Sequence, residues 1–166
     1  MGVLIGRELD FIIVVNASCK EGDFACLQKL VGDRLELKML DDRSLLALQG
    51  PKAAAVLTDL GAEINDMVFM DGAWLEIRGI ECWATRSGYT GEDGFEIFGS
   101  HEYIGKLWEQ LIASGVTPCG LAARDVLRLE VCYPLYGHEL NDEITPLDAA
   151  LAWTVKLNKT SFIGKK

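Results

Sequence analysis

The fold of this chain is marked most clearly by the stretch Ser87-Gly88-Tyr89-Thr90-Gly91-Glu92-Asp93-Gly94-Phe95-Glu96-Ile97. Its three glycines recur at intervals of three, and glycine can take a positive φ or let another group approach the backbone closely. The residues that follow alternate, so that Phe95 and Ile97 share one face of a strand and Glu96 points to the other. The stretch therefore predicts a shaped loop ahead of a strand that displays the Glu96 carboxylate.

Two other interpretations of this glycine-rich loop follow from the residues alone. A phosphate cradle needs exposed N–H groups and usually a lysine, whereas Glu92 and Asp93 supply negative charge here. Phosphate binding is therefore disfavoured. The spacing by itself favours an acidic hairpin turn whose carboxylates are solvated.

Composition and charge restrict the class of protein. The chain has 166 residues, 49% of them hydrophobic, and a formal net charge of −9. This length suffices for one domain with a core, or for part of a larger protein. The acidic balance argues against nucleic-acid and anionic-membrane partners, which require a basic face. No apolar run reaches the roughly 18 residues of a membrane span, and Met1–Arg7 is too short for a secretory signal. We expect a cytoplasmic protein, or one of the mitochondrial matrix if eukaryotic.

Cysteine and histidine usage predicts neither a disulfide framework nor a metal site. The cysteines are odd in number and scattered, without a C-x-x-C pair. They are Cys19, Cys26, Cys82, Cys119 and Cys132. We expect reduced, mostly buried thiols. His138-Glu139 lacks the second histidine of a metal-binding helix, so no metal ligand is assigned.

The first sixty residues predict a βαββα order. Phe11–Val15 is apolar and β-branched, as in a buried strand, and a helix is expected over roughly Lys20–Leu30. Alternation over Leu35–Met39 predicts a half-buried strand that forms a hairpin with Leu45–Leu48. A second helix is expected from Gln49-Gly50-Pro51 to about Leu60.

The remaining sequence predicts further strands and two helices. Strands are expected near Val68–Met70, Trp74–Ile77 and Glu81–Arg86. Ser100-His101-Glu102 is typical of a helix cap and is followed by apolar residues on one helical face. A further helix is expected over Leu121–Cys132. Together these segments predict an α+β fold, with a ferredoxin-like βαββα sheet joined to a second antiparallel sheet with helices.

Charged residues are unusually dense in the Leu121–Cys132 segment, which otherwise resembles core. Asp125 and Arg128 are spaced to form an i,i+3 pair, which leaves Arg124 to point elsewhere. From the residues alone, an ion pair of Arg124 with Asp125 or Glu130 is the favoured alternative.

Several long motifs occur in one order along the chain. They are Ser87–Ile97, Gly120–Asp125 continued by Leu127–Glu130, Tyr133–Glu139 and Ile144–Leu147, with weaker matches at Val14–Ala17, Ala47–Pro51 and Phe162-Ile163-Gly164. The sequence resembles the aminomethyltransferase family, the T-protein of the glycine cleavage system. The resemblance covers nearly the whole chain.

The resemblance implies a tetrahydrofolate-dependent transfer. T-proteins pass the aminomethyl group on the lipoyl arm of H-protein to tetrahydrofolate, giving 5,10-methylenetetrahydrofolate, ammonia and the reduced lipoyl arm. By resemblance, Glu96 binds the amino-pyrimidine edge of the pterin, Tyr89 lines the folate pocket, and Arg124 faces the benzoyl-glutamate end. A carboxylate can accept two N–H bonds, a tyrosine ring can cover an apolar face, and a guanidinium suits a carboxylate.

Two departures from the family pattern bear on activity. The family's catalytic aspartate lies upstream of the Val14–Ala17 match, and Asp10 is not assigned this role. A small β-barrel-like domain follows the Phe-Ile-Gly motif in T-proteins. We therefore expect residues 1–166 to resemble the central folate-binding region, with residues 1–85 as the ferredoxin-like part and 86–166 as the remainder. No catalytic residue is assigned, and exposed apolar surface is expected to favour self-association.

Two alternative functions remain open. One is another tetrahydrofolate-dependent transferase, such as a demethylase or the folate domain of a sarcosine-type dehydrogenase, which uses a different one-carbon donor. The other is a non-catalytic folate-binding or partner-docking module.

Overall fold

The computed structural model describes residues 4–7, 10–162 and 164–165. It contains two compact units: residues 1–87 with 93–116, and residues 88–92 with 117–166. The described residues exclude Ile163 of the Phe-Ile-Gly motif. They also exclude residues 1–3, which begin the Met1–Arg7 segment considered above as a signal.

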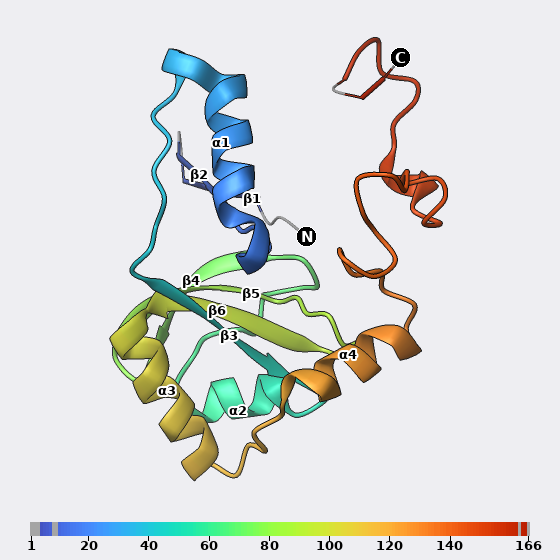
Figure 1. Cartoon of the computed structure of the whole chain (residues 1–166). Helices are drawn as coiled ribbons and strands as arrows, with labels where there is room; N and C mark the ends of the chain where they lie inside the picture. The colour runs from blue at the N-terminus through green and yellow to red at the C-terminus, as the bar shows by residue number, and fades with distance from the viewer. Residues whose placement is uncertain (1–3, 8–9, 163, 166) are drawn as a thin grey trace. The chain divides into compact units, whose positions relative to one another are not determined.

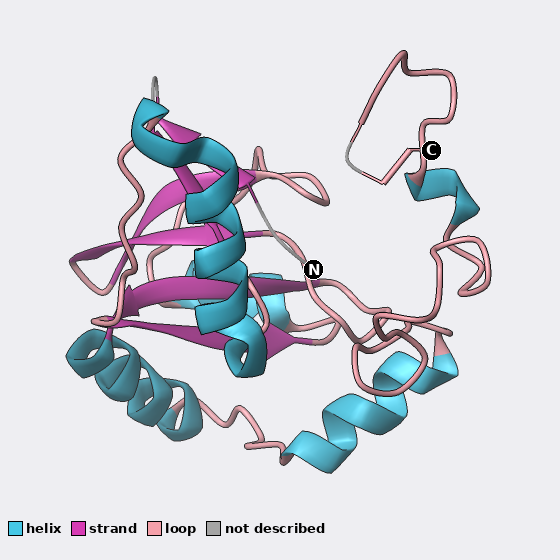
Figure 2. Cartoon of the chain, turned by 45° about the horizontal axis from the view of Figure 1, so that its top comes forward, coloured by secondary structure: helices cyan, strands magenta, loops and turns pink. Residues whose placement is uncertain are grey.

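A four-stranded antiparallel sheet forms the centre of the first unit (Figure 2). Its strands are β3 (Arg43–Gln49), β4 (Gly72–Ile77), β5 (Ile80–Thr85) and β6 (Gly94–Ser100), in the order β3-β6-β5-β4. Strands β4 and β5 form a hairpin through Arg78-Gly79, which has φ values of 53° and 78° and is typical of a tight hairpin turn.

Two helices, α2 (Ala53–Asp59) and α3 (His101–Ala113), pack on one face of this sheet (Figure 1). Alternate strand residues face them, including Leu46, Phe95 and Ile97, and all three are buried. The Ser100 Oγ atom accepts from the Tyr103 N–H at 3.2 Å and caps α3, as its sequence predicts. The opposite face of β6 carries Glu96.

The N-terminal part contains a two-stranded antiparallel sheet of β1 (Leu4–Arg7) and β2 (Asp10–Ile13), then helix α1 (Lys20–Val31). A strand and a helix were expected here, and both are present. The expectation that the strand is buried was wrong, since Phe11 is 70% exposed. Its apolar, β-branched residues favour a strand, but burial requires a packed layer on both faces.

Helix α2 and strands β4, β5 and β6 agree with the sequence, and the α+β class with antiparallel sheets is confirmed. The βαββα order is not formed, because Leu35–Met39 is not a strand and β3 pairs with β6 instead. The strand expected at Val68–Met70 is also absent. Here the Asp71 carboxylate accepts from the Val68 N–H at 2.8 Å, and Met70 has a φ of 75°, which bends the chain into a turn.

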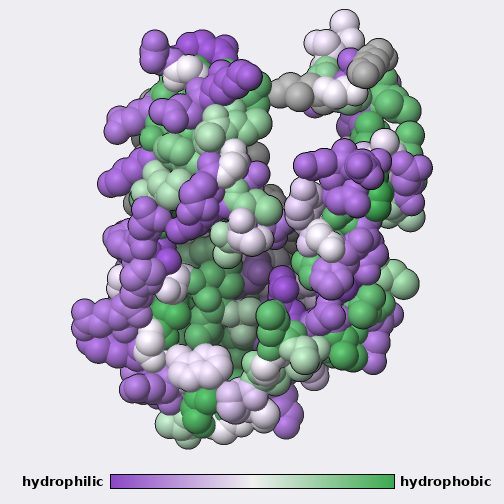
Figure 3. Space-filling view, viewed as in Figure 1, coloured by the Kyte–Doolittle hydropathy of each residue, from purple (hydrophilic) through white to green (hydrophobic). Residues whose placement is uncertain are grey.

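The second unit contains α4 (Leu121–Glu130), a short 3-10 helix (Ala152–Thr154) and turns. Helix α4 ends before the expected Cys132, whose φ of 60° is incompatible with a right-handed helix. Hydrophobic residues lie on the surface of the second unit (Figure 3). Its exposed apolar side chains include Leu121 and Leu129 of α4 and Trp153.

The expectation of mostly buried thiols was wrong. Cys82 is buried, while Cys26, Cys119 and Cys132 are exposed. Burial raises the pKa of the Cys82 thiol to about 11. Among the described helices, none is both long and apolar enough to cross a membrane.

Candidate functional site

The Glu96 carboxylate lies on the face of β6 opposite the buried Phe95 and Ile97, as the alternation predicts. Its strand position is directly across from Thr85 of β5 and Ala47 of β3. The side chain is half-buried, and Glu96 Oε2 accepts from Ser87 Oγ at 3.0 Å. A carboxylate has about four acceptor positions on its two oxygens, so one hydrogen bond leaves it able to accept further N–H donors.

Two buried hydroxyl groups adjoin this carboxylate. Thr85 and Ser87 are each 3% exposed, and their oxygens lie 2.7 Å apart. Thr85 is the last residue of β5 and lies across from Glu96, and Ser87 lies two residues beyond the strand, where its hydroxyl contacts both side chains. Sequence reasoning did not identify these hydroxyl groups, because alternation gives the direction of a side chain only within a strand.

An ion pair closes the base of the glycine-rich loop. Arg86 donates from Nε and Nη2 to the two Asp93 carboxylate oxygens at 2.9 and 2.6 Å, and from Nη1 to the Met67 carbonyl at 2.7 Å. This pair holds the pKa of the Asp93 carboxyl below its usual value and raises the pKa of Arg86. The interpretation of the loop as a turn with solvated carboxylates was therefore wrong for Asp93.

Gln49 joins the two ends of the loop. Its Nε2 donates to the Ser87 carbonyl at 3.1 Å and to the Phe95 carbonyl at 3.3 Å. The same side chain fills the space beside Gly94, where an added Cβ would lie 2.6 Å from the Gln49 amide. Gly94 is therefore required by close packing, whereas Gly91 has a positive φ of 78°.

Tyr89 and Arg124 meet within the second unit. The Arg124 guanidinium carbon lies over the Tyr89 ring at 4.8 Å from its centroid, and the Tyr89 and Tyr133 rings stack with centroids 5.4 Å apart. The Tyr89 hydroxyl donates to the Pro134 carbonyl. Burial raises the pKa of Tyr89, and the nearby positive charges of Arg128 and Arg124 oppose the shift.

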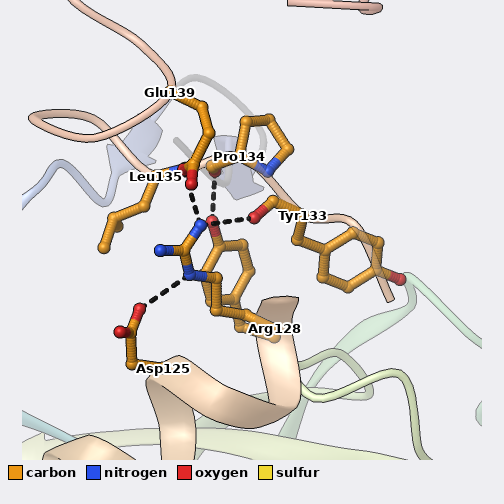
Figure 4. Close-up of polar contacts among 7 residues, drawn as sticks. Asp125, Arg128, Tyr133, Pro134, Leu135 and Glu139 are labelled. Carbon is orange, nitrogen blue, oxygen red and sulfur yellow. Dashed lines mark hydrogen bonds and ion pairs between the residues drawn. The ribbon is translucent and has the colours of Figure 1, made fainter. Parts of the chain in front are cut away.

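Arg128 forms the polar centre of the second unit (Figure 4). Its side chain is 2% exposed and donates to Asp125 at 2.8 Å, to Glu139 at 2.6 Å and to the Tyr133 carbonyl at 3.1 Å. The predicted Asp125–Arg128 pair is thus confirmed. Among the described residues, Arg124 forms no ion pair with Asp125 or Glu130 and lies over the Tyr89 ring instead. Glu139 was missed, because its partner lies eleven residues earlier in the sequence.

The three residues assigned by resemblance fall in different units. Tyr89 and Arg124 are in contact in the second unit, and Glu96 belongs to the first. Ser87 and Asp93, which precede and follow residues 88–92, are held by Gln49 and Arg86. The two ends of the Tyr89 loop are therefore fixed within the sheet unit.

Comparison with known proteins gives a consistent result. The family model of the GCVT N-terminal domain matches residues 3–159. Aminomethyltransferases of Exiguobacterium sibiricum and Geobacillus kaustophilus are 45% and 46% identical, over 96% and 95% of this chain. The crystal structure of the glycine cleavage system aminomethyltransferase T from Bartonella henselae has a TM-score of 0.80 at 42% identity and covers 94% of this chain.

These matches cover only part of each relative. The chain spans 45% and 46% of the two aminomethyltransferases and 44% of the Bartonella chain. The matched residues include the glycine-rich loop, β6 with Glu96, and α4 with Arg124 and Arg128. The chain therefore belongs to the GCVT N-terminal domain family.

Proposed function

We propose that this chain provides the folate-binding region of an aminomethyltransferase that transfers the aminomethyl group from lipoylated H-protein to tetrahydrofolate in glycine cleavage. The observation that carries the proposal is the half-buried Glu96 carboxylate, which lies on the face of β6 opposite the buried Phe95 and Ile97 and accepts from Ser87. Family membership supports the reaction class.

Glu96 is proposed to bind the amino-pyrimidine edge of the pterin. That edge presents neighbouring N–H donors, which a carboxylate can accept with two oxygens. The Ser87 contact fixes the Glu96 side chain, so that less conformational entropy is lost when a ligand binds. The substrate tetrahydrofolate then accepts the one-carbon unit.

Tyr89 and Arg124 are proposed to contact the remainder of the folate. The Arg124 guanidinium lies over the Tyr89 ring, and a guanidinium presents N–H donors that match a carboxylate. This geometry supports a role for Arg124 toward the benzoyl-glutamate end. The Tyr89 ring is held by Tyr133 and Arg124, which suits a fixed pocket wall.

The wider assignments belong to the same proposal. Residues 1–85 and 86–166 are proposed as the two parts of a folate-binding region, and lipoylated H-protein as the partner. No metal is proposed. The bacterial relatives support residence in the cytoplasm.

A second candidate function is a folate-binding module without transferase activity. A third is transfer to tetrahydrofolate from another donor, such as a methylated glycine.

Binding and turnover separate these functions. Tetrahydrofolate is titrated into the full chain by calorimetry, and ammonia release is then followed with H-protein whose lipoyl arm carries the aminomethyl group. Binding with ammonia release from H-protein supports the aminomethyltransferase, and binding without release supports the module. Absence of binding contradicts both.

The Glu96→Ala variant tests the residue that carries the proposal. We expect affinity for tetrahydrofolate to fall by about tenfold to a hundredfold, since the pterin donors lose a charged acceptor. Glu92→Ala, which removes an exposed carboxylate from the same loop, is the control and should bind like the wild type. Unchanged affinity in Glu96→Ala would remove Glu96 from the site.

A further inference from the structure

We propose that Ser87 is a positioning residue for Glu96, and that Thr85 fixes the direction in which the Ser87 hydroxyl donates. The inference rests on the proposed folate-binding role of Glu96. In the ligand-free protein, the two buried hydroxyl groups hold the Glu96 carboxylate in one orientation.

The sheet register brings these three side chains together. Thr85 and Glu96 are direct cross-strand neighbours in β5 and β6, and Ser87 follows Thr85 by two residues. Ser87 lies just beyond the end of β5, and its hydroxyl contacts both Thr85 and Glu96. The resulting distances are 2.7 Å between the Thr85 and Ser87 oxygens and 3.0 Å from Ser87 to Glu96 Oε2.

The available protons determine the direction of this chain of hydrogen bonds. An ionised carboxylate only accepts, so the single Ser87 proton is directed to Glu96. The contact between Thr85 and Ser87 then requires Thr85 to donate. Thr85 therefore excludes the alternative orientation, in which Ser87 donates back to Thr85 and leaves the carboxylate unheld.

Burial makes the arrangement rigid. Both hydroxyl groups are 3% exposed, so neither can readily exchange its partner for bulk water, and leaving one unpaired is costly. The Ser87 backbone is held as well, because Gln49 donates to its carbonyl. The same Gln49 amide donates to the carbonyl of Phe95, the neighbour of Glu96. Ser87 and the Glu96 backbone are thus fixed relative to each other.

A double-mutant cycle tests whether Ser87 acts through Glu96. Tetrahydrofolate is the probe, and binding to the full chain is measured by calorimetry. We expect Ser87→Ala to weaken binding by about tenfold in the wild-type background and by less than about twofold in the Glu96→Ala background. Equal losses in the two backgrounds, or no loss in the first, would overturn the proposal.

Thr85 provides a second test with a conservative rescue. Thr85→Val keeps the shape and removes the hydroxyl, so we expect binding to weaken by roughly threefold. Thr85→Ser restores the hydroxyl without the methyl group and should bind like the wild type. If Thr85→Ser is weakened as much as Thr85→Val, packing rather than the hydroxyl is responsible, and the Thr85 assignment fails.

A measurement without folate separates this inference from the proposed function. Crystal structures of the ligand-free wild type and Ser87→Ala should show one Glu96 rotamer in the first and several, or a different one, in the second. The same single rotamer in both would contradict positioning by Ser87. If the wild type does not bind tetrahydrofolate, the proposed function fails, while the rotamers still decide whether Ser87 orients Glu96.

Discussion

The two units of this chain are stabilised by different interactions. The eighteen buried apolar residues of the described chain all belong to the first unit, where the sheet packs against α2 and α3. Among the described residues of the second unit, the buried side chain is that of Arg128. One unit is thus held mainly by hydrophobic burial and the other by hydrogen bonds to a charged group.

This difference matters for function. A close-packed apolar core transmits strain and keeps a strand in register, which suits the Glu96 display on β6. A polar centre such as Arg128 depends on each of its partners and loses stability when one is removed. We therefore expect the second unit to be the more readily opened part of the chain.

The largest effect is expected in the core of the first unit. Leu107 of α3 is fully buried, and Leu107→Ala should lower the free energy of unfolding by about 2–5 kcal/mol through lost burial and a cavity. Urea denaturation measures the change. The exposed neighbour Glu109→Ala is the control, with an expected change within about 0.5 kcal/mol. A loss below about 1 kcal/mol for Leu107→Ala would show that this core is not close-packed.

Arg128→Met tests the polar centre of the second unit. Without the guanidinium, the Tyr133 carbonyl and the carboxylates of Asp125 and Glu139 lose a hydrogen-bond donor. Backbone amides of residues 117–140 should therefore exchange hydrogen with solvent about tenfold faster or more. Exchange in β3–β6 should stay unchanged. The control is Glu130→Gln at an exposed position of the same helix, which should leave exchange in both units unchanged. Uniform acceleration in both units would contradict the distinction between them.

The Arg86–Asp93 pair gives a smaller effect that depends on pH. The pKa of Asp93 is lower in the folded protein than in the unfolded chain, where it is about 3.9. The ion pair therefore stabilises the folded protein fully above that unfolded-state pKa, and the stabilisation is lost as pH falls through the folded-state pKa. Asp93→Asn should therefore cost about 1–2 kcal/mol of unfolding free energy at pH 5–7, with the difference from the wild type shrinking below about pH 4.

Urea denaturation across this pH range measures the Asp93 effect. Glu92→Gln, at the exposed neighbouring position, is the matched control and should show little change at any pH. A constant difference between Asp93→Asn and the wild type down to pH 2 would refute the ion-pair assignment.

The smallest effect on stability is expected at the exposed apolar surface of the second unit. Trp153 is 74% exposed, and Trp153→Ala should leave the unfolding free energy nearly unchanged while reducing self-association. Sedimentation velocity over a range of concentrations measures the change. A wild-type chain that stays monomeric throughout would show that this surface does not drive association.

Local patterns predicted much of the fold. The periodicity of α1 and α3 and the Ser100 cap are properties of neighbouring residues, and the structure confirms them. Alternation also placed Glu96 correctly on the face opposite Phe95. Such features follow from backbone geometry and need no knowledge of distant contacts.

Long-range pairing could not be predicted in the same way. Leu35–Met39 alternates like a strand, but β3 obtains its partner from β6, about fifty residues later. An alternating segment forms a strand only where a neighbouring strand supplies hydrogen bonds. The Arg128–Glu139 and Ser87–Glu96 contacts were missed for the same reason, since both depend on how distant segments meet.

The most direct test of the proposed folate role is hydrogen exchange with and without tetrahydrofolate. We predict slower exchange in β6 and the preceding loop, residues 87–98, and separately in residues 120–128 of α4, because Glu96, Tyr89 and Arg124 are proposed to contact the ligand. Amides of α1 should not change. Unchanged exchange in residues 87–98 at saturating tetrahydrofolate would contradict the assignment of Glu96 to the folate site.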